Sequence, residues 1–305
     1  MEGARSCRRA ELAMTTSAQL RSGKGSGDEN FPVASWLIKP QHRPVILAFY
    51  EFVRVADDIA DHPKLESAEK IARLDRLEAS LLGNDDDEPE GVTLRAVLNR
   101  RGLSTRHAQD LLSAFRQDAT KLRYADWDDL IDYCSRSAMP VGRFVLDVHG
   151  EARDAWLASD ALCAALQVIN HVQDCAKDYR SLDRVYIPLD AFKASGATVE
   201  ELGNSKASQA LRYCLQGVVG RTTTLLRKSD GFATSVNDTR LGLEISVIHS
   251  LANRLLAILS VRDPLCEVVH LSRAEAMATA IGAIPRAILW RLLRTVAPAH
   301  GYQTP

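Results

Sequence analysis

The sequence predicts an all-α fold in a single domain. Apolar residues recur at steps of three and four along almost the whole chain, whereas the period-2 alternation of half-buried strands is rare. The chain has 305 residues, 46% of them hydrophobic, which is enough to build a substantial core. No internal repeat of fixed period is present, so the pattern indicates one helical domain.

Eight helical spans follow in order from this periodicity. The first covers residues 41–61 and ends there because Pro63 disfavours helical geometry at His62. The second, 65–82, stops at the acidic, Gly- and Pro-containing loop of residues 83–91. The other amphipathic spans are 104–121, 126–148, 155–179, 206–228, 239–261 and 271–296, with further breaks at 149–154 and 187–198.

The expected domain of roughly eight to ten helices occupies residues 28–296. Residues 1–27 contain Arg and Ser but no apolar segment, which predicts an extension without fixed structure rather than a secretory signal. Residues 297–305 form a short C-terminal tail.

Composition argues against several classes of function. Basic residues number 38 and acidic residues 39, without a long basic run, so we expect no nucleic-acid partner. No run approaches the ~18 apolar residues of a membrane-spanning helix. The six cysteines lack metal-binding spacing, and a reducing cytoplasm fits them best. No P-loop, GxSxG, HExxH or GxGxxG motif appears, so we expect no nicotinamide cofactor.

The segment "FYEFVRVADDIADHP", residues 49–63, places three aspartates at the end of an aromatic and apolar run. At about 100° per residue, Tyr50, Arg54, Asp57 and Asp61 share one face of the helix. Acids at the C-terminal end of a helix oppose its dipole, at a cost of ~0.3–1 kcal/mol each. A bound cation would reverse that cost.

The segment "LQVINHVQDCAKDYR", residues 166–180, repeats this design. Gln167, Asn170, Asp174 and Asp178 follow three- and four-residue steps on one face of one expected helix. Carboxylate and amide oxygens are the ligands of hard cations such as Mg²⁺, which commonly bridge to phosphates. Two such faces opposed across a bundle would form an oxygen-lined cavity for metal and diphosphate.

The alternative interpretation is that each acidic face is simply solvated. A solvated face usually interleaves positive and negative charges, and these two faces do not. Arg54 has the further alternative of pairing only with the aspartates that follow it, and Arg184 that of a surface ion pair with Asp183. His171 is expected to be structural because no second histidine lies one turn away.

These acidic segments resemble the squalene and phytoene synthase family, in which two aspartate-rich helices face each other across an all-α cavity. The likeness runs from about Phe31 to about residue 295. It implies the trans-isoprenoid synthase fold, a helical bundle around a central cavity. It also implies Mg²⁺, with Mn²⁺ as a substitute, and the metal ligands are Asp57, Asp61, Asn170, Asp174 and Asp178.

The resemblance further implies which side chains act on the substrate. The catalytic residues would be Asp57, Asp61, Asp174, Asp178 and, in "YC", Tyr133. Substrate contacts would come from Asp28, Glu29, Asn30, Phe31, Tyr50, Arg54 and Gln167, with Arg143 a further candidate. Arg54 and Arg184, as permanently charged planar donors, could bind diphosphate oxygens in bidentate fashion. Aromatic faces can stabilise a carbocation without attacking it, and the candidates are Phe31, Tyr50, Tyr133 and Phe144.

Within the family, the likeness is closest to the branch of the bacterial hopanoid pathway that forms hydroxysqualene. Its signatures are "ENFPVAS" at 29–35, "FYEFVRVADDIADHP" at 49–63, "YCSRSAMPVGR" at 133–143 and "DRVYIP" at 183–188, and "PVGR" is the most telling part of them. Two positions depart from the expected pattern. Met139 replaces an expected Asn, and Arg254 stands where some members carry a phosphate-binding Tyr.

The implied reaction converts presqualene diphosphate and water to hydroxysqualene and diphosphate. Metal ions would neutralise charge on the departing oxygens. The runner-up is head-to-head condensation of two prenyl diphosphates to presqualene diphosphate, squalene or phytoene. An interpretation from another class is an inactive member that serves assembly or membrane recruitment, which the intact acid pairs disfavour.

The same resemblance suggests functional links to a presqualene diphosphate synthase and to a squalene-forming oxidoreductase. We expect a cytoplasmic protein with, at most, peripheral contact at the inner membrane, because no long basic amphipathic helix stands out.

Overall fold

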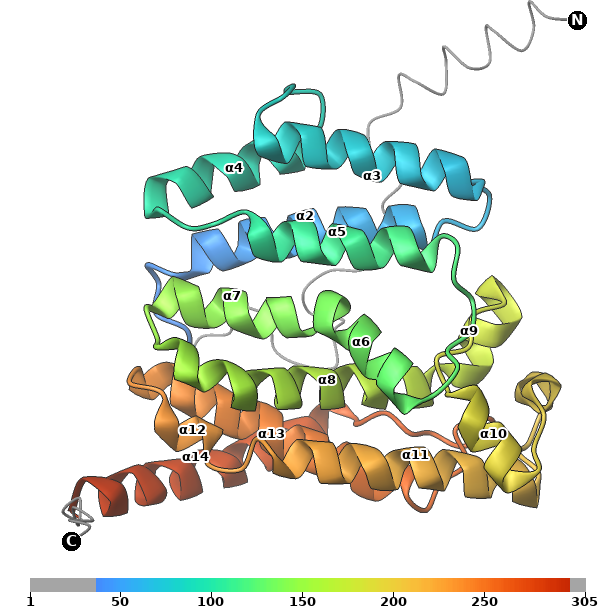
Figure 1. Ribbon diagram of the computed structural model, residues 1–305. Helices are drawn as coiled ribbons and strands as arrows, with labels where there is room; N and C mark the ends of the chain where they lie inside the picture. The colour runs from blue at the N-terminus through green and yellow to red at the C-terminus, as the bar shows by residue number, and fades with distance from the viewer. Residues whose placement is uncertain (1–36, 297–305) are drawn as a thin grey trace, which may run out of the picture.

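The computed structural model describes residues 37–296 and is built from helices (Figure 1). No strand occurs in this range, and one isolated bridge joins Arg123 to Val185. The α-helices are α2 (Arg43–Ala60), α3 (Ser67–Leu82), α4 (Pro89–Arg101), α5 (Arg106–Asp118), α6 (Trp127–Ser137), α7 (Met139–His149), α8 (Trp156–Gln173), α9 (Cys175–Leu182), α10 (Leu189–Ser195), α11 (Gln209–Arg227), α12 (Phe232–Ser235), α13 (Thr239–Leu259) and α14 (Arg273–Val296). Two 3-10 helices, η2 (Arg153–Ala155) and η3 (Val199–Gly203), complete the described elements. The all-α prediction is confirmed.

Some predicted features fall outside the described residues. They are the extension at 1–27, the substrate-contacting residues Asp28, Glu29, Asn30 and Phe31, and the tail at 297–305.

Two of the expected helices are each divided in the structure. The span 126–148 breaks at Ala138, because Pro140 has no backbone N–H with which to continue the ladder of α6. The span 155–179 breaks at Asp174, so that α8 and α9 are separate helices. Figure 1 shows α9 turning away from the axis of α8.

Three short or weakly patterned helices were not predicted. α10 and α12 have seven and four residues, too few to display an amphipathic period. α4 begins with Pro89 and buries only Gly91, Leu94 and Leu98, so its apolar face is narrow. The loop expected at 83–91 is therefore shorter, because Pro89 already belongs to α4.

The core forms around α2 and α8. α2 packs against α3, α4, α5 and α7, whereas α8 packs against α6, α7, α11 and α13. Phe49 of α2 stacks on Phe144 of α7, with ring centroids 3.8 Å apart, and both rings are buried. α2 and α8, which carry most of the predicted acid stripes, are thus held in place by buried apolar contacts on their other faces.

Gly142, in the "PVGR" segment, permits the close approach of α7 and α8. A Cβ atom at this position would overlap Ser159 Oγ and Cys163 Sγ, both on α8. The glycine of this segment is therefore required by helix packing.

α13 is long and apolar enough, by length and composition, to cross a membrane, and 56% of its most apolar window is buried within the protein. It packs against α8, α11, α12 and α14. These contacts are those of a core helix.

Candidate active site

The first acidic face lies at the C-terminal end of α2, as predicted. The helix ends at Ala60, and Asp61 is its C-cap residue, with its backbone N–H donating to the carbonyl of Asp57. Arg54 donates from Nη1 to Asp57 at 2.8 Å and from Nη2 to Asp58 at 2.9 Å. The pairing considered as an alternative for Arg54 is thus present, and it draws Asp57 and Asp58 together around one guanidinium.

The second acidic face is interrupted at Asp174. This residue has φ −98° and ψ 6° and separates Asn170, on α8, from Asp178, on α9. The prediction that all four polar residues share one helix is therefore wrong. The four-residue steps survive locally, because the N–H of Asp174 donates to the carbonyl of Asn170 and that of Asp178 to the carbonyl of Asp174.

The two acidic faces converge at Arg184, whose Nη1 donates to Asp61 Oδ1 at 2.7 Å and whose backbone N–H donates to the Asp178 carbonyl at 3.2 Å. Burial, then the charge of Asp174 and then that of Asp61 raise the pKa of Asp178 to about 7. Burial and the charge of Asp61 likewise raise the pKa of Asp57, although Arg54 opposes the shift. Asp61 of α2 thus lies close enough to Asp178 of α9 to influence its ionisation.

These carboxylates fit the donor set of a hard divalent cation. The side chains of Asp57, Asp61 and Asp174 are 35%, 44% and 39% exposed, so solvent and ligands reach them. Asn170 and Asp178 are also partly exposed. Burial raises the pKa of Asp57 and of Asp178, and the neighbouring aspartates raise it further, so the site holds an excess of negative charge that a cation would neutralise.

Arg184 joins this cluster from the loop after α9. It is only 4% exposed, and its Nη1 donates to Asp61 Oδ1 at 2.7 Å. The alternative pairing of Arg184 with Asp183 is wrong, because Asp183 pairs with Arg123 at 2.5 Å. A buried, permanent positive charge therefore lies directly against one of the predicted metal ligands.

Tyr133 lies in a buried polar cluster behind Arg184. Its hydroxyl donates to Asp118 Oδ2 at 2.7 Å, and the hydroxyl of Tyr186 donates to Asp118 Oδ1 at 3.0 Å. Nη1 of Arg184 donates to the Tyr186 oxygen at 3.2 Å. Tyr124 stacks on Tyr186, which gives this cluster a wall of aromatic rings.

His171 also belongs to this aromatic wall. Its ring stacks on Tyr186 with centroids 3.5 Å apart, and burial together with the charge of Arg184 lowers its pKa to about 3. The imidazole is therefore neutral at physiological pH. Stacking is its observed contact, in agreement with the structural role expected for it.

Sequence reasoning did not single out Asp118, Tyr186 or Tyr124. The "DRVYIP" signature contains Tyr186, but only Arg184 was taken from it. Asp118 ends the helix α5 and looks like an ordinary surface acid in the sequence, yet it is 4% exposed.

Other predicted residues are not shown to meet the acids. Arg143 forms a bidentate ion pair with Asp160, at 2.8 and 2.6 Å, and its guanidinium lies over the Trp156 ring. Gln167 and Tyr50 are partly exposed on the predicted faces of α8 and α2. A substrate contact by any of these three side chains stays a prediction.

Met139 and Arg254, which depart from the family pattern, lie on α7 and α13. Met139 is the first residue of α7 and is 9% exposed within the main hydrophobic core. Arg254 is exposed on α13. Phe144, a candidate for the cavity lining, is 1% exposed and packs on Phe49.

A groove of about 190 Å³ lies elsewhere, between α10 and α11. Trp127 lines it with Arg221, whose guanidinium is 4.7 Å from the centre of the Trp127 ring and 3.8 Å from Asp190. None of the predicted metal ligands lines this groove.

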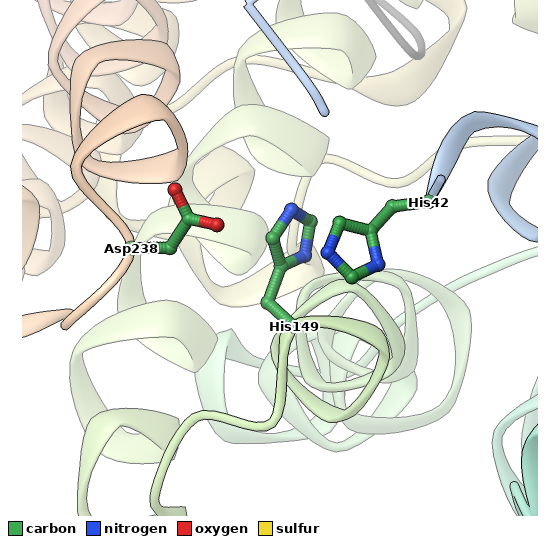
Figure 2. Close-up of side chains that lie close together, drawn as sticks. All are labelled: His42, His149 and Asp238. Carbon is green, nitrogen blue, oxygen red and sulfur yellow. The ribbon is translucent and has the colours of Figure 1, made fainter. Parts of the chain in front are cut away.

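A second cluster of potential metal ligands comprises His42, His149 and Asp238 (Figure 2). Its surroundings are already rich in cations. Arg101 donates to Nδ1 of His42 at 3.0 Å, and Lys39 pairs with Asp238 at 2.9 Å. The cluster has one carboxylate, which Lys39 already neutralises, and Arg101 occupies one nitrogen of His42, so we assign no metal to it.

Comparison with known proteins identifies the family of this chain. The sequence model described as squalene/phytoene synthase matches residues 25–275. The chain belongs to the squalene/phytoene synthase family. A protein of Rhodopseudomonas palustris named hydroxysqualene synthase is 57% identical over 278 residues, covering 91% of this chain and 95% of the relative. The hydroxysqualene synthase of Zymomonas mobilis is 50% identical, covering 87% and 90%.

Solved structures show the same fold. The squalene synthase HpnC of Alicyclobacillus acidocaldarius superposes with a TM-score of 0.67 at 29% identity, covering 82% of this chain and 92% of that one. A dehydrosqualene synthase in complex with a ligand gives a TM-score of 0.74 at 20% identity, covering 90% and 96%. The predicted isoprenoid synthase architecture is confirmed.

Proposed function

We propose that this enzyme converts presqualene diphosphate and water to hydroxysqualene and diphosphate, with Mg²⁺ as its cofactor. The observation that carries the proposal is the convergence of the two acidic faces at Arg184, which donates from Nη1 to Asp61 and from its backbone N–H to the Asp178 carbonyl. The names of relatives that are 50–57% identical over most of the chain support this product.

The metal would be held by Asp57, Asp61, Asn170, Asp174 and Asp178. When bound, Mg²⁺ supplies Lewis-acid neutralisation of charge on the departing diphosphate oxygens, and Mn²⁺ should substitute for it. The carboxylates of this chain provide the negative charge that retains such a cation.

Arg184 and Arg54 would bind the diphosphate oxygens beside these acids. Each guanidinium is held by aspartate, Arg184 by Asp61 and Arg54 by Asp57 and Asp58. Fixed planar donors of this kind suit bidentate recognition of phosphate. Their orientation before substrate arrives reduces the conformational cost of binding.

In the proposed reaction, a C–O bond to diphosphate is replaced by a C–O bond to the oxygen of water. The C–O bond to diphosphate breaks, and its electron pair leaves with the diphosphate. The cyclopropane ring opens as the cation rearranges, a water oxygen adds to the resulting allylic carbon, and one proton is released. The aromatic wall of Tyr124, Tyr133 and Tyr186 would stabilise positive charge nearby.

A product assay with purified protein tests this proposal. Presqualene diphosphate with Mg²⁺ and no nicotinamide should give hydroxysqualene and inorganic diphosphate. Farnesyl diphosphate alone should give neither squalene nor phytoene. Release of a hydrocarbon from farnesyl or geranylgeranyl diphosphate would favour head-to-head condensation instead, as carried out by the phytoene synthases named among more distant relatives, which are 26–28% identical.

A diphosphate-binding measurement in the presence of Mg²⁺, beside the product assay, separates catalysis from a purely structural role in an assembly. An inactive subunit would bind no diphosphate in the presence of Mg²⁺, whereas the enzyme should bind it and turn over. The alcohol would then need a reducing enzyme to become squalene, and a presqualene diphosphate synthase to supply the substrate. We propose a cytoplasmic location for this step, with peripheral contact at the inner membrane where the lipid substrate resides.

A further inference from the structure

Asp118, at the C-terminal end of α5, is a buried acid with an unusual set of partners. Both of its carboxylate oxygens accept hydrogen bonds from phenols, Oδ2 from Tyr133 at 2.7 Å and Oδ1 from Tyr186 at 3.0 Å. A carboxylate that is 4% exposed is costly unless such bonds are made. The two hydroxyl protons are therefore directed at Asp118.

The backbone of Asp118 holds Arg184 at the same time. Nη2 of Arg184 donates to the Asp118 carbonyl at 3.1 Å, and Nη1 donates to the oxygen of Tyr186 and to Asp61. Asp118, Tyr186 and Arg184 thus form a closed ring of hydrogen bonds. One edge of this ring touches Asp61, a predicted metal ligand, and another touches Tyr133, a predicted catalytic residue.

We infer that Asp118 is a positioning residue for the reaction, acting through the hydroxyl groups of Tyr133 and Tyr186 and through Arg184. The inference rests on the proposed function, because it is the proposed reaction that requires these groups to be held in one orientation. The Tyr133 hydroxyl donates its proton to Asp118 and so does not donate it to the substrate. The lone pairs of the Tyr133 oxygen remain available to accept a hydrogen bond from water or to face positive charge. Tyr186 uses its lone pair to accept from Arg184.

A purely structural role predicts a different result, and Glu151 provides the matched control. Glu151 is also buried, at 9% exposure, and accepts from the N–H and Nδ2 of Asn237 and from the N–H of Asp238. These bonds join the chain after α7 to the start of α13. Glu151→Gln therefore disturbs a buried carboxylate of similar connectivity that none of these bonds links to the acids.

The experiment measures kcat and diphosphate affinity in Asp118→Asn. An amide accepts from one phenol only and donates to the oxygen of the other, which reverses that hydrogen bond and turns its hydroxyl proton away, so kcat should fall roughly 10- to 100-fold. The backbone carbonyl that holds Arg184 is unchanged. Affinity for inorganic diphosphate with Mg²⁺, measured by calorimetry, should therefore stay within about threefold of wild type.

A double-mutant comparison separates positioning from independent effects. In a Tyr133→Phe, Tyr186→Phe background, Asp118 has no hydroxyl group to orient. Adding Asp118→Asn to that background should lower kcat by less than about twofold, because the three groups act as a unit. If Asp118→Asn does not fold, the Tyr186→Phe variant breaks the same ring and should show the same loss of kcat at unchanged diphosphate affinity.

Three results would overturn the inference: a wild-type kcat in Asp118→Asn, an equal loss in the double-phenylalanine background, or the same loss in Glu151→Gln. Failure of the proposed function appears instead in the wild-type protein. Turnover of farnesyl rather than presqualene diphosphate would refute that function, while the kcat ratios with farnesyl diphosphate would still test Asp118. A wild-type protein inactive on both substrates would refute both proposals.

Discussion

Replacing Asp178 with Asn should stabilise the metal-free protein and remove its response to Mg²⁺. The pKa of Asp178 is raised to about 7, by burial first and then by Asp174 and Asp61. At neutral and higher pH, the folded chain therefore contains a carboxylate whose ionised form it disfavours. An amide occupies nearly the same volume without that charge.

The magnitude follows from this pKa and from the exposure of the group. A rise from the ordinary value of 3.8 to about 7 would be worth at most roughly 4 kcal/mol. Because Asp178 is only partly buried, solvent screening reduces this to about 1–2 kcal/mol. For a chain of this size, the melting temperature of Asp178→Asn should exceed that of wild type by about 2–8 °C above neutral pH.

The direction in which folding stability changes with pH follows from proton binding. A raised carboxyl pKa means that the folded state binds more protons than the unfolded state from about pH 4 to about pH 7. Stability from this group falls as pH rises through that window. The advantage of Asp178→Asn should thus be small near pH 4 and complete above about pH 7.

Thermal unfolding followed by circular dichroism, in EDTA and in Mg²⁺, measures both effects. Asp132→Asn is the matched control, because Asp132 is 65% exposed on α6 and pairs only with Arg136 in the described contacts. Its stability should change by less than about 0.5 kcal/mol, with the wild-type response to Mg²⁺ retained. A lower melting temperature for Asp178→Asn in EDTA at high pH, or an undiminished gain from Mg²⁺, would refute the reasoning.

Four further outcomes are expected. Asp57→Asn and Asp174→Asn should each lower kcat by about 100-fold or more with an unchanged circular dichroism spectrum, since an amide is a weaker ligand than a carboxylate; normal turnover would remove the residue from the site. EDTA should abolish product formation, and Mg²⁺ or Mn²⁺ should restore it, as gas chromatography would show. Gly142→Ala should cost about 1–3 kcal/mol in urea unfolding, because the methyl group overlaps α8, and a neutral result would contradict that packing. Met139→Asn should preserve or increase hydroxysqualene formation if the side chain borders the cavity, whereas complete loss of product would show that this buried position serves only the core.

The end of α2 could be predicted because local rules determine it. Pro63 restricts the residue before it, and the apolar arc of the helix fixes which face Asp57 and Asp61 share. The structure ends α2 at Ala60 and buries that arc, as expected. Periodicity and the proline rule together were sufficient here.

The break at Asp174 could not be predicted from the same periodicity. The residues on both sides of it keep steps of three and four, so a continuous helix satisfies the sequence equally well. In the structure, Gln173 donates to the carbonyl of Val269, and His270 lies 3.8 Å from Asp174. Contacts with a loop almost a hundred residues away accompany the change of direction, and such contacts leave no local pattern.

The buried network around Asp118 could not be predicted from the local sequence either. A charged residue at a helix end is usually exposed, so burial of Asp118 follows only from the packing of α5 against α6 and of Tyr133 and Tyr186 around it. The pairing of Arg184 with Asp61 spans 123 positions in the sequence. The chemistry of its guanidinium made Arg184 a candidate, but only the fold assigns its partner.

The fate of oxygen from water tests the central claim most directly. Purified protein should be incubated with presqualene diphosphate and Mg²⁺ in water labelled with oxygen-18, without nicotinamide, and the product analysed by mass spectrometry. The account predicts hydroxysqualene whose hydroxyl group carries the heavy isotope, with release of inorganic diphosphate. An unlabelled alcohol, or a hydrocarbon as the sole product, would contradict it.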